Sequence, residues 1–131
     1  MDKELLRKEV EHNINVVYHL SKAMRADKEV ALIALENSFP YNDQHYVVDE
    51  IYSIFSKEVK NDREVIGMGW EAEGISILPH ITDKSVFGDK EFWVKTLKRN
   101  YRSRTDESIL LKYLDPHLRT DEEILKLLGR N

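Results

Sequence analysis

The sequence predicts an all-α fold: an irregular helical repeat, a short stack of about seven or eight helices, in a single domain that covers residues 1–131. Three observations predict it. A ten-residue motif occurs four times, each copy holds two residues of the kind that begin helices, and apolar residues at helical spacing stand before and after each copy. Each motif with its flanks therefore predicts a helix, a one-turn segment and a second helix.

The first half of the motif predicts the one-turn segment. The four copies read SKAMRADKEV, SKEVKNDREV, DKSVFGDKEF and DPHLRTDEEI, and they begin at Ser21, Ser56, Asp83 and Asp115. Side-chain oxygens of Ser and Asp accept hydrogen bonds from free backbone N–H groups at helix starts, so these residues are predicted N-caps. Pro116 follows Asp115 at the first helical position, where proline is best tolerated. About six residues lie between this cap and the next, which is room for one turn.

The second half of the motif predicts the start of a longer helix. Its predicted caps are Asp27, Asp62, Asp89 and Asp121. A Glu stands two residues after each of them, in the first turn, where its charge favours the positive end of the helix dipole. The aspartates recur at intervals of 35, 27 and 32 residues, which is typical of helical solenoids whose units bury their apolar stripe against their neighbours.

The other segments up to the second motif follow the same logic. Residues 2–23 carry apolar residues at helical spacing and predict one or two helices. The Pro, Asn and Asp content of residues 37–45 predicts a loop. Asp43 then caps a predicted helix from about Gln44 to Phe55.

Three features are expected after the second motif. Gly67 and Gly69, inside a helix, permit close packing. Residues 73–83 are apolar and β-branched, so a short strand is the alternative to a helix there. Thr105 or Asp106 begins a predicted helix that continues through Tyr113.

Two of the motif copies resemble a known repeat. The stretches MRADKEVALIALEN, at residues 24–37, and VKNDREVIGMGWEAEGISIL, at residues 59–78, are similar to a helical repeat family classed as a domain of unknown function (family number 4116), with a consensus of roughly LRxDREVVLxAVxxNGxAL. Gly74 matches the consensus glycine, whereas residues 38–49 depart from the pattern as an insertion. The resemblance implies an α-helical repeat and carries no activity.

Composition excludes several classes of protein. The chain has no cysteine, which excludes disulfides, thiolate zinc sites and cysteine nucleophiles and fits a reducing compartment. Its net charge of −4 gives no general attraction to nucleic acid or to an anionic membrane. The charged N-terminus does not read as a signal peptide, and no apolar run approaches the roughly 20 residues that span a bilayer. The expected location is cytoplasmic, without membrane association.

No catalytic constellation is recognisable. The five histidines show no metal-ligand spacing, and GMGW at residues 67–70 lacks the Lys and the spacing of a phosphate loop. The motif aspartates are interpreted as helix caps rather than as paired catalytic acids. The sequence therefore predicts neither an enzyme nor a cofactor, and a small enzyme whose site has no motif is the third hypothesis.

A basic segment at residues 95–104 is the candidate functional feature. It stands out in an otherwise acidic chain, with Trp93 close by, and its candidate partner-binding residues are Lys95, Lys98, Arg99, Tyr101, Arg102 and Arg104. Arg and aromatic residues are enriched at protein-binding hot spots, and the same types bind phosphates and stacked bases. A solvated helix end is the structural alternative, because cations suit a helix C-terminus. The predicted function is non-catalytic binding of a protein partner, which is expected to be acidic; a nucleic-acid-binding accessory protein is the alternative.

Overall fold

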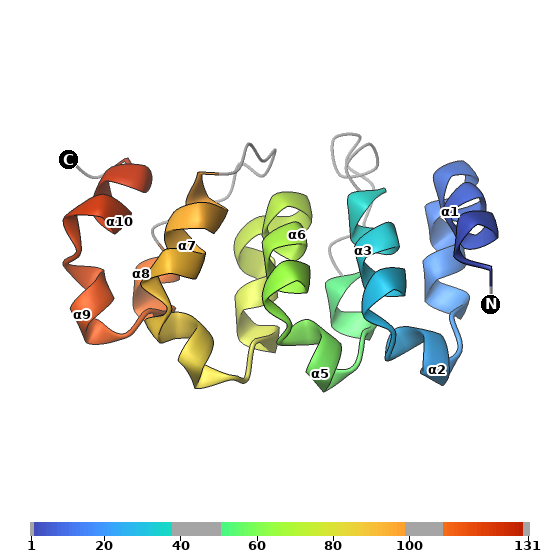
Figure 1. Cartoon of the computed structure of the whole chain (residues 1–131), viewed down its shortest axis with the longest axis horizontal. Coiled ribbons are helices and arrows are strands. Elements are labelled where there is room, and N and C mark those ends of the chain that lie inside the picture. Colours follow the sequence, from blue (N-terminus) through green and yellow to red (C-terminus); the bar gives the residue numbers. More distant parts are fainter. Residues whose placement is uncertain (1, 38–50, 99–108, 130–131) are drawn as a thin grey trace.

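The computed structural model describes residues 2–37, 51–98 and 109–129, and these residues form helices and no strand. The predicted all-α class is confirmed. The described residues hold nine α-helices and four 3₁₀-helices, more than the seven or eight expected, because the one-turn segments stand as separate helices. The helices form an elongated stack with the two termini at opposite ends (Figure 1).

Four units follow the predicted order of helix, one-turn helix and helix, and one helix precedes them. The first helix is α1 (Lys3–His12). The units are η1 (Ile14–His19), α2 (Lys22–Arg25) and α3 (Lys28–Glu36); η2 (Tyr52–Ile54), α5 (Lys57–Lys60) and α6 (Arg63–Glu73); η3 (Gly74–His80), η4 (Lys84–Gly88) and α7 (Lys90–Leu97); and α8 (Leu110–Tyr113), α9 (Pro116–Arg119) and α10 (Glu122–Leu127).

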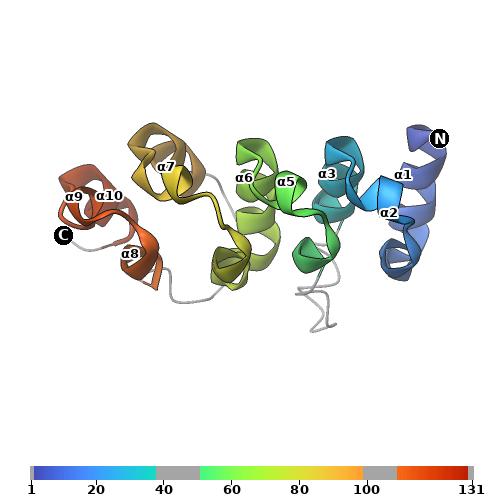
Figure 2. The same cartoon turned by 90° about the horizontal axis from the view of Figure 1, so that it is seen from below.

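The units stack in two layers. Helices α1, α3, α6, α7 and α10, called the row helices below, lie side by side in that order, and each contacts the next (Figure 1). Elements η2, η3 and α8 form a second layer in which η3 contacts both η2 and α8, and which is visible when the stack is seen from below (Figure 2). Two layers let each row helix bury one face and leave the opposite face of the row open.

Side-chain caps fix the start of most helices. Among the eight predicted caps of the four motifs, all except Asp115 accept a backbone N–H: Ser21 from Met24, Asp27 from Glu29 and Val30, Ser56 from Val59, Asp62 from Glu64 and Val65, Asp83 from Ser85, Asp89 from Phe92, and Asp121 from Glu123 and Ile124. Each such bond satisfies a backbone donor that the helix itself leaves free.

Asp115 is an exception to the predicted capping. It occupies the N-cap position of α9, but its side chain makes no cap hydrogen bond. The N–H of Leu118 is taken by the backbone carbonyl of Asp115 at 2.9 Å, and Pro116 has no N–H to offer. The carboxylate lies beside Gly88 instead, since a Cβ built there would be 2.5 Å from Asp115 Oδ2.

Aromatic side chains fill the middle of the core. Trp70 and Trp93 are fully buried and meet edge to face with ring centroids 5.5 Å apart. The Trp93 indole N–H donates to the carbonyl of Val86 at 2.8 Å, so its polar atom is satisfied inside the core. Phe87 stacks on the other side of Trp93 with centroids 6.2 Å apart. Trp93 is therefore part of the core and not of a binding surface.

The expectation for Gly69 and the strand alternative have different outcomes. Gly69 permits close packing as predicted, because Tyr52 lies where its side chain would be. Gly74 ends α6 with a φ of 64°, a backbone conformation that glycine adopts without strain. The strand alternative for residues 73–83 is wrong: residues 74–80 form η3, in which Ile77 and Leu78 are fully buried.

Some expectations lie wholly or largely outside the described residues. These are most of the loop at 37–45, the insertion at 38–49, the cap at Asp43 with the start of its helix, and the cap at Thr105 or Asp106. The ends of both predicted helices are described, as η2 and α8.

Candidate binding face

A series of ion pairs joins the first turns of consecutive row helices. In each case the first residue of one row helix is a cation that reaches the carboxylates of the next unit. The pairs are Lys3 with Asp27 (3.3 Å) and Glu29 (3.0 Å), Lys28 with Asp62 (3.3 Å) and Glu64 (2.9 Å), Arg63 with Asp89 (3.3 Å) and Asp83 (3.7 Å), and Lys90 with Asp121 (2.9 Å) and Glu123 (3.6 Å). We call this set the charge ladder.

The charge ladder gives the motif carboxylates a second structural role. Asp121 caps α10 and also binds Lys90, and the hydrogen bond from Lys90 holds the pKa of Asp121 below its ordinary value. The same hydrogen bond, which Lys90 donates and Asp121 accepts, raises the pKa of Lys90. The motif acids are thus engaged by caps and cations, which agrees with their interpretation as structural residues rather than as a catalytic pair.

Sequence reasoning missed the charge ladder, although its signal was present. In the first three copies of the motif, the residue between the second capping residue and the Glu is a cation: Lys28, Arg63 or Lys90. The start of α1 also reads Asp2–Lys3–Glu4, which repeats the second half of the motif ahead of the four complete copies. A cation at this position, next to a capping Asp, is the feature that would have predicted contacts between units.

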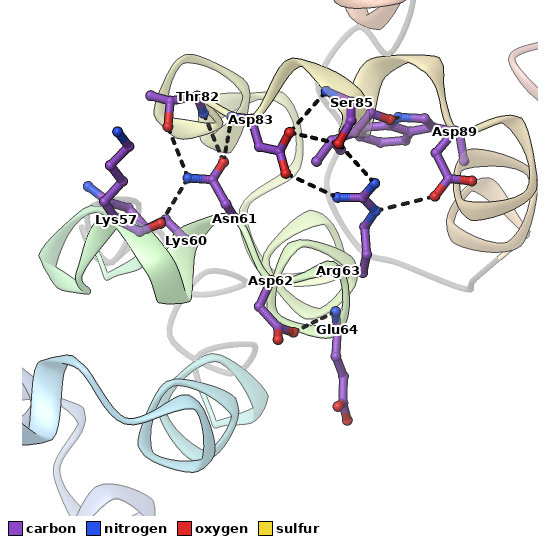
Figure 3. A network of polar contacts seen from close by, with 12 residues as sticks. Lys57, Lys60, Asn61, Asp62, Arg63, Glu64, Thr82, Asp83, Ser85 and Asp89 are labelled. Carbon is purple, nitrogen blue, oxygen red and sulfur yellow. Dashed lines mark hydrogen bonds and ion pairs between the residues drawn. The ribbon is translucent and has the colours of Figure 1, made fainter.

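The junction between the second and third units has an additional cross-link through Asn61 (Figure 3). Its Oδ1 accepts the N–H groups of Thr82 and Asp83, both at 2.9 Å. Its Nδ2 donates to Lys57 O at 2.8 Å and to Thr82 Oγ1 at 3.0 Å. One half-buried side chain therefore holds the segment that enters η4 against the end of α5.

Surface grooves follow the open face of the row. One lies between α1 and α3, with a volume of about 210 Å³, and a second lies between α6 and α7, with about 350 Å³. A third lies between α7 and α10, with about 590 Å³. We call the surface that holds the second and third grooves the α7 face, because α7 borders both.

In the groove between α1 and α3, the cations are neutralised by carboxylates of the same chain. Arg7 Nη1 lies 3.0 Å from Glu36 Oε2, and Lys3 Nζ lies 3.0 Å from Glu29 Oε2, so ion pairs bridge from α1 to α3 at two levels. Glu4 also lies 3.9 Å from Arg7. The cations of this groove have internal partners.

The α7 face is different, because two of its cations have no internal counterion in the described part of the chain. Lys95 and Lys98 are exposed, and no ion pair found among the described residues involves either of them. The lining of the α7–α10 groove is Lys90, Glu91, Val94, Lys95, Lys98 and Glu123.

The groove between α6 and α7 shares Lys95 with its neighbour. Its lining also includes Gly67 and Phe92, and the guanidinium carbon of Arg63 lies 5.9 Å from the centre of the Phe92 ring. Because Arg63 is also bound to Asp89, it is fixed at one end of this groove. Lys95 is the cation that both grooves present to solvent.

The predicted basic segment is therefore only partly placed by the structure. It brings Lys95 and Lys98 to one face of the row, at the end of α7. Arg99, Tyr101, Arg102 and Arg104 lie outside the described residues.

The described histidines and carboxylates form no metal-binding cluster. Among the described residues there is no cluster of three or more His, Asp or Glu side chains arranged to hold a metal ion. His80 packs against Tyr52 with ring centroids 6.1 Å apart, and burial, together with the nearby charge of Lys60, lowers the pKa of its imidazole. Within the same described ranges no helix has the length and apolar character that crossing a bilayer requires.

Comparison with known proteins identifies no relative. No family model matches the chain, and neither a curated protein nor a solved structure is significantly similar to it.

Proposed function

We propose that the protein is a non-catalytic binding module of helical repeats and that the α7 face binds a protein partner. The observation that carries the proposal is the exposed pair Lys95 and Lys98, which borders grooves on both sides of α7 and has no counterion among the described residues. The half-buried side chains of Phe92 and Val94 lie between these cations and the core. Cations around a partly apolar groove suit an acidic protein surface.

The stacked architecture supports a binding role rather than a catalytic one. Helical solenoids present extended surfaces on which a partner contacts several units at once. The charge ladder and the caps hold the row helices in register, so the grooves are formed before a partner arrives, and less conformational entropy is lost on binding. The resemblance to the helical repeat family and a cytoplasmic location are part of the same proposal, the latter supported by the absence of cysteine.

The experiment is crosslinking from the proposed face. A photoreactive lysine analogue that keeps the ε-ammonium charge replaces Lys95 of the full chain and is activated in native lysate, and the crosslinked proteins are identified by mass spectrometry. The same amino acid at position 84, an exposed lysine of η4, is the control. We expect a distinct protein crosslink from position 95 that is lost when Lys98 is also changed to Ala, and that persists with Lys57→Ala.

Two results contradict the proposal. Crosslinks that are equally abundant from positions 95 and 84 would show that the α7 face has no preferred partner. A position 95 crosslink that disappears after nuclease treatment and contains nucleotide would support the alternative, a nucleic-acid-binding accessory protein that uses residues 95–104.

A further inference from the structure

The two outer grooves of the row differ in how their charges are balanced. In the α1–α3 groove, Glu36 on the second helix neutralises Arg7 on the first at 3.0 Å. The α7–α10 groove is neutralised in the same way at the end where both helices begin, because Lys90 forms ion pairs there with Asp121 and Glu123. At the other end, Lys95 and Lys98 meet no carboxylate within the described residues.

We propose that the counter-charge at this end of the α7–α10 groove is supplied by an acidic segment of the partner, whose carboxylates bind Lys95 and Lys98 while an apolar side chain packs on Val94. This inference rests on the proposed function and specifies the chemistry of the partner. It concerns a peptide segment with Asp or Glu next to an apolar residue.

The spacing of the two lysines supports this occupant. Residues three apart on a helix are neighbours on its surface, so Lys95 and Lys98 place two positive charges side by side. Like charges at such spacing repel each other, and a carboxylate between them removes the repulsion and gains two charge-assisted hydrogen bonds.

The groove also fixes which end of the segment is acidic. Glu91 and Glu123 lie at the end of the groove where α7 and α10 begin, and both are exposed. Acidic residues of a partner are repelled there and attracted toward Lys98, where α7 ends. Val94 lies between the two ends and is only half-buried, so it offers the apolar contact in the middle. The expected segment therefore has its carboxylates at one end and neutral or basic residues at the other.

The test uses defined probes and the full chain labelled with ¹⁵N. The first probe is a short N-acetylated, C-amidated peptide in which a pair of leucines is followed by Asp and Glu residues. The second has Asn and Gln in place of those acids, and the third is an oligouridylate of similar length. We expect the acidic peptide to shift the amide resonances of α7 and α10 and the neutral peptide to leave them unchanged.

Matched variants assign the contacts. Lys95→Gln with Lys98→Gln is expected to weaken binding of the acidic peptide about two- to thirtyfold, the effect of losing two exposed charge pairs. Lys57→Gln with Lys84→Gln removes the same charge from exposed positions in α5 and η4, outside the groove, and is expected to leave binding unchanged. A charge reversal, Lys95→Glu with Lys98→Glu, is expected to bind a peptide in which Lys replaces the acids.

Three outcomes overturn the inference. Equal binding of the neutral peptide means that charge does not select the occupant. Shifts confined to α1 and α3, or none at all with the acidic peptide, mean that the lysines only balance the end of a helix. Tighter binding of oligouridylate at the same lysines assigns the groove to nucleic acid. If position 95 captures a cellular protein but the acidic peptide does not bind, the proposed function stands and this inference fails. If the peptide binds but position 95 captures no protein, the proposed function fails, and with it the claim that a cellular partner supplies the counter-charge.

Discussion

Substitution of Gly69 by Ala tests the packing between α6 and the second layer. A methyl group at Gly69 would lie 2.6 Å from Cδ2 and 2.8 Å from Cε2 of Tyr52. That ring is held in place, because its hydroxyl donates to Lys60 O, its backbone N–H donates to the carboxylate of Glu73, and only 1% of the residue is exposed. The ring therefore cannot move aside without breaking these contacts.

The magnitude follows from two opposing terms. Gly→Ala inside a helix ordinarily stabilises by about 1 kcal/mol, whereas overpacking a fixed core costs about 1–3 kcal/mol. With an anchored ring as the obstacle, we expect a net loss of about 1–2 kcal/mol. For a chain of this length that lowers the melting temperature by about 4–8 °C, measured by circular dichroism.

A matched glycine provides the control. A methyl group at Gly88 would meet Asp115 Oδ2 at 2.5 Å, which is just as close, but that carboxylate makes no cap hydrogen bond that a rotation of the side chain would break. Gly88→Ala is expected to stay within about 0.5 kcal/mol of the native protein. The double variant Gly69→Ala with Tyr52→Leu should lose about 2 kcal/mol less unfolding free energy than the sum of the losses in the two single variants. A melting temperature that rises in Gly69→Ala, or equal losses at both glycines, would refute the reasoning.

Two further predictions concern the caps and the dependence of stability on pH. Asp62→Ala should destabilise by about 0.5–2 kcal/mol in urea unfolding, and Asp115→Ala by less, because the side chain of Asp62 accepts two backbone N–H groups and that of Asp115 accepts none. Equal losses would contradict the cap geometry. The hydrogen bond from Lys90 lowers the pKa of Asp121, and the Ser85 hydroxyl lowers the pKa of Asp83. These two carboxylates therefore contribute fully to stability above the ordinary Asp pKa near 3.8, and their contribution is lost as the pH falls below it. The pKa of Lys90 is raised above 10.5 by Asp121, so its contribution is lost only as the pH rises through that higher value. Urea midpoints from pH 2 to 11 should show a smaller acid loss in Asp121→Asn, and an unchanged acid limb would contradict this assignment.

Local sequence signals predicted the units of the fold well. N-cap residues act on backbone donors two or three positions away, so Ser21, Asp27 and Asp62 are readable from the chain without knowledge of tertiary structure. The exception is Asp115, whose carboxylate occupies an N-cap position without a cap hydrogen bond, an outcome that its residue type does not reveal. The strand alternative for residues 73–83 is wrong because β-propensity depends on the surroundings: Ile77 and Leu78 are fully buried within a 3₁₀-helix.

Contacts between units were not predictable in the same way. Lys28 reaches Asp62 and Glu64, which are far along the chain, and only the stacking of units brings them together. Sequence reasoning identified Lys95 and Lys98 from local charge density, but the grooves beside them depend on the separation of α6, α7 and α10. The internal neutralisation of Arg7 by Glu36, which distinguishes one groove from another, likewise required the three-dimensional arrangement.

The charge ladder has a consequence for how such units are exchanged or duplicated. Compatibility between neighbouring units depends on the sign of a single residue, the first residue of the row helix, which must be Lys or Arg to receive the carboxylates of the unit that follows. In α10 this residue is Glu122. A shuffled protein in which the α10 unit was moved to an internal position would place Glu122 against the next Asp and Glu, so reordering the units requires a change of this residue to Lys. The first residue of the row helix thus sets the α10 unit apart from the other three units, in which this residue is a cation.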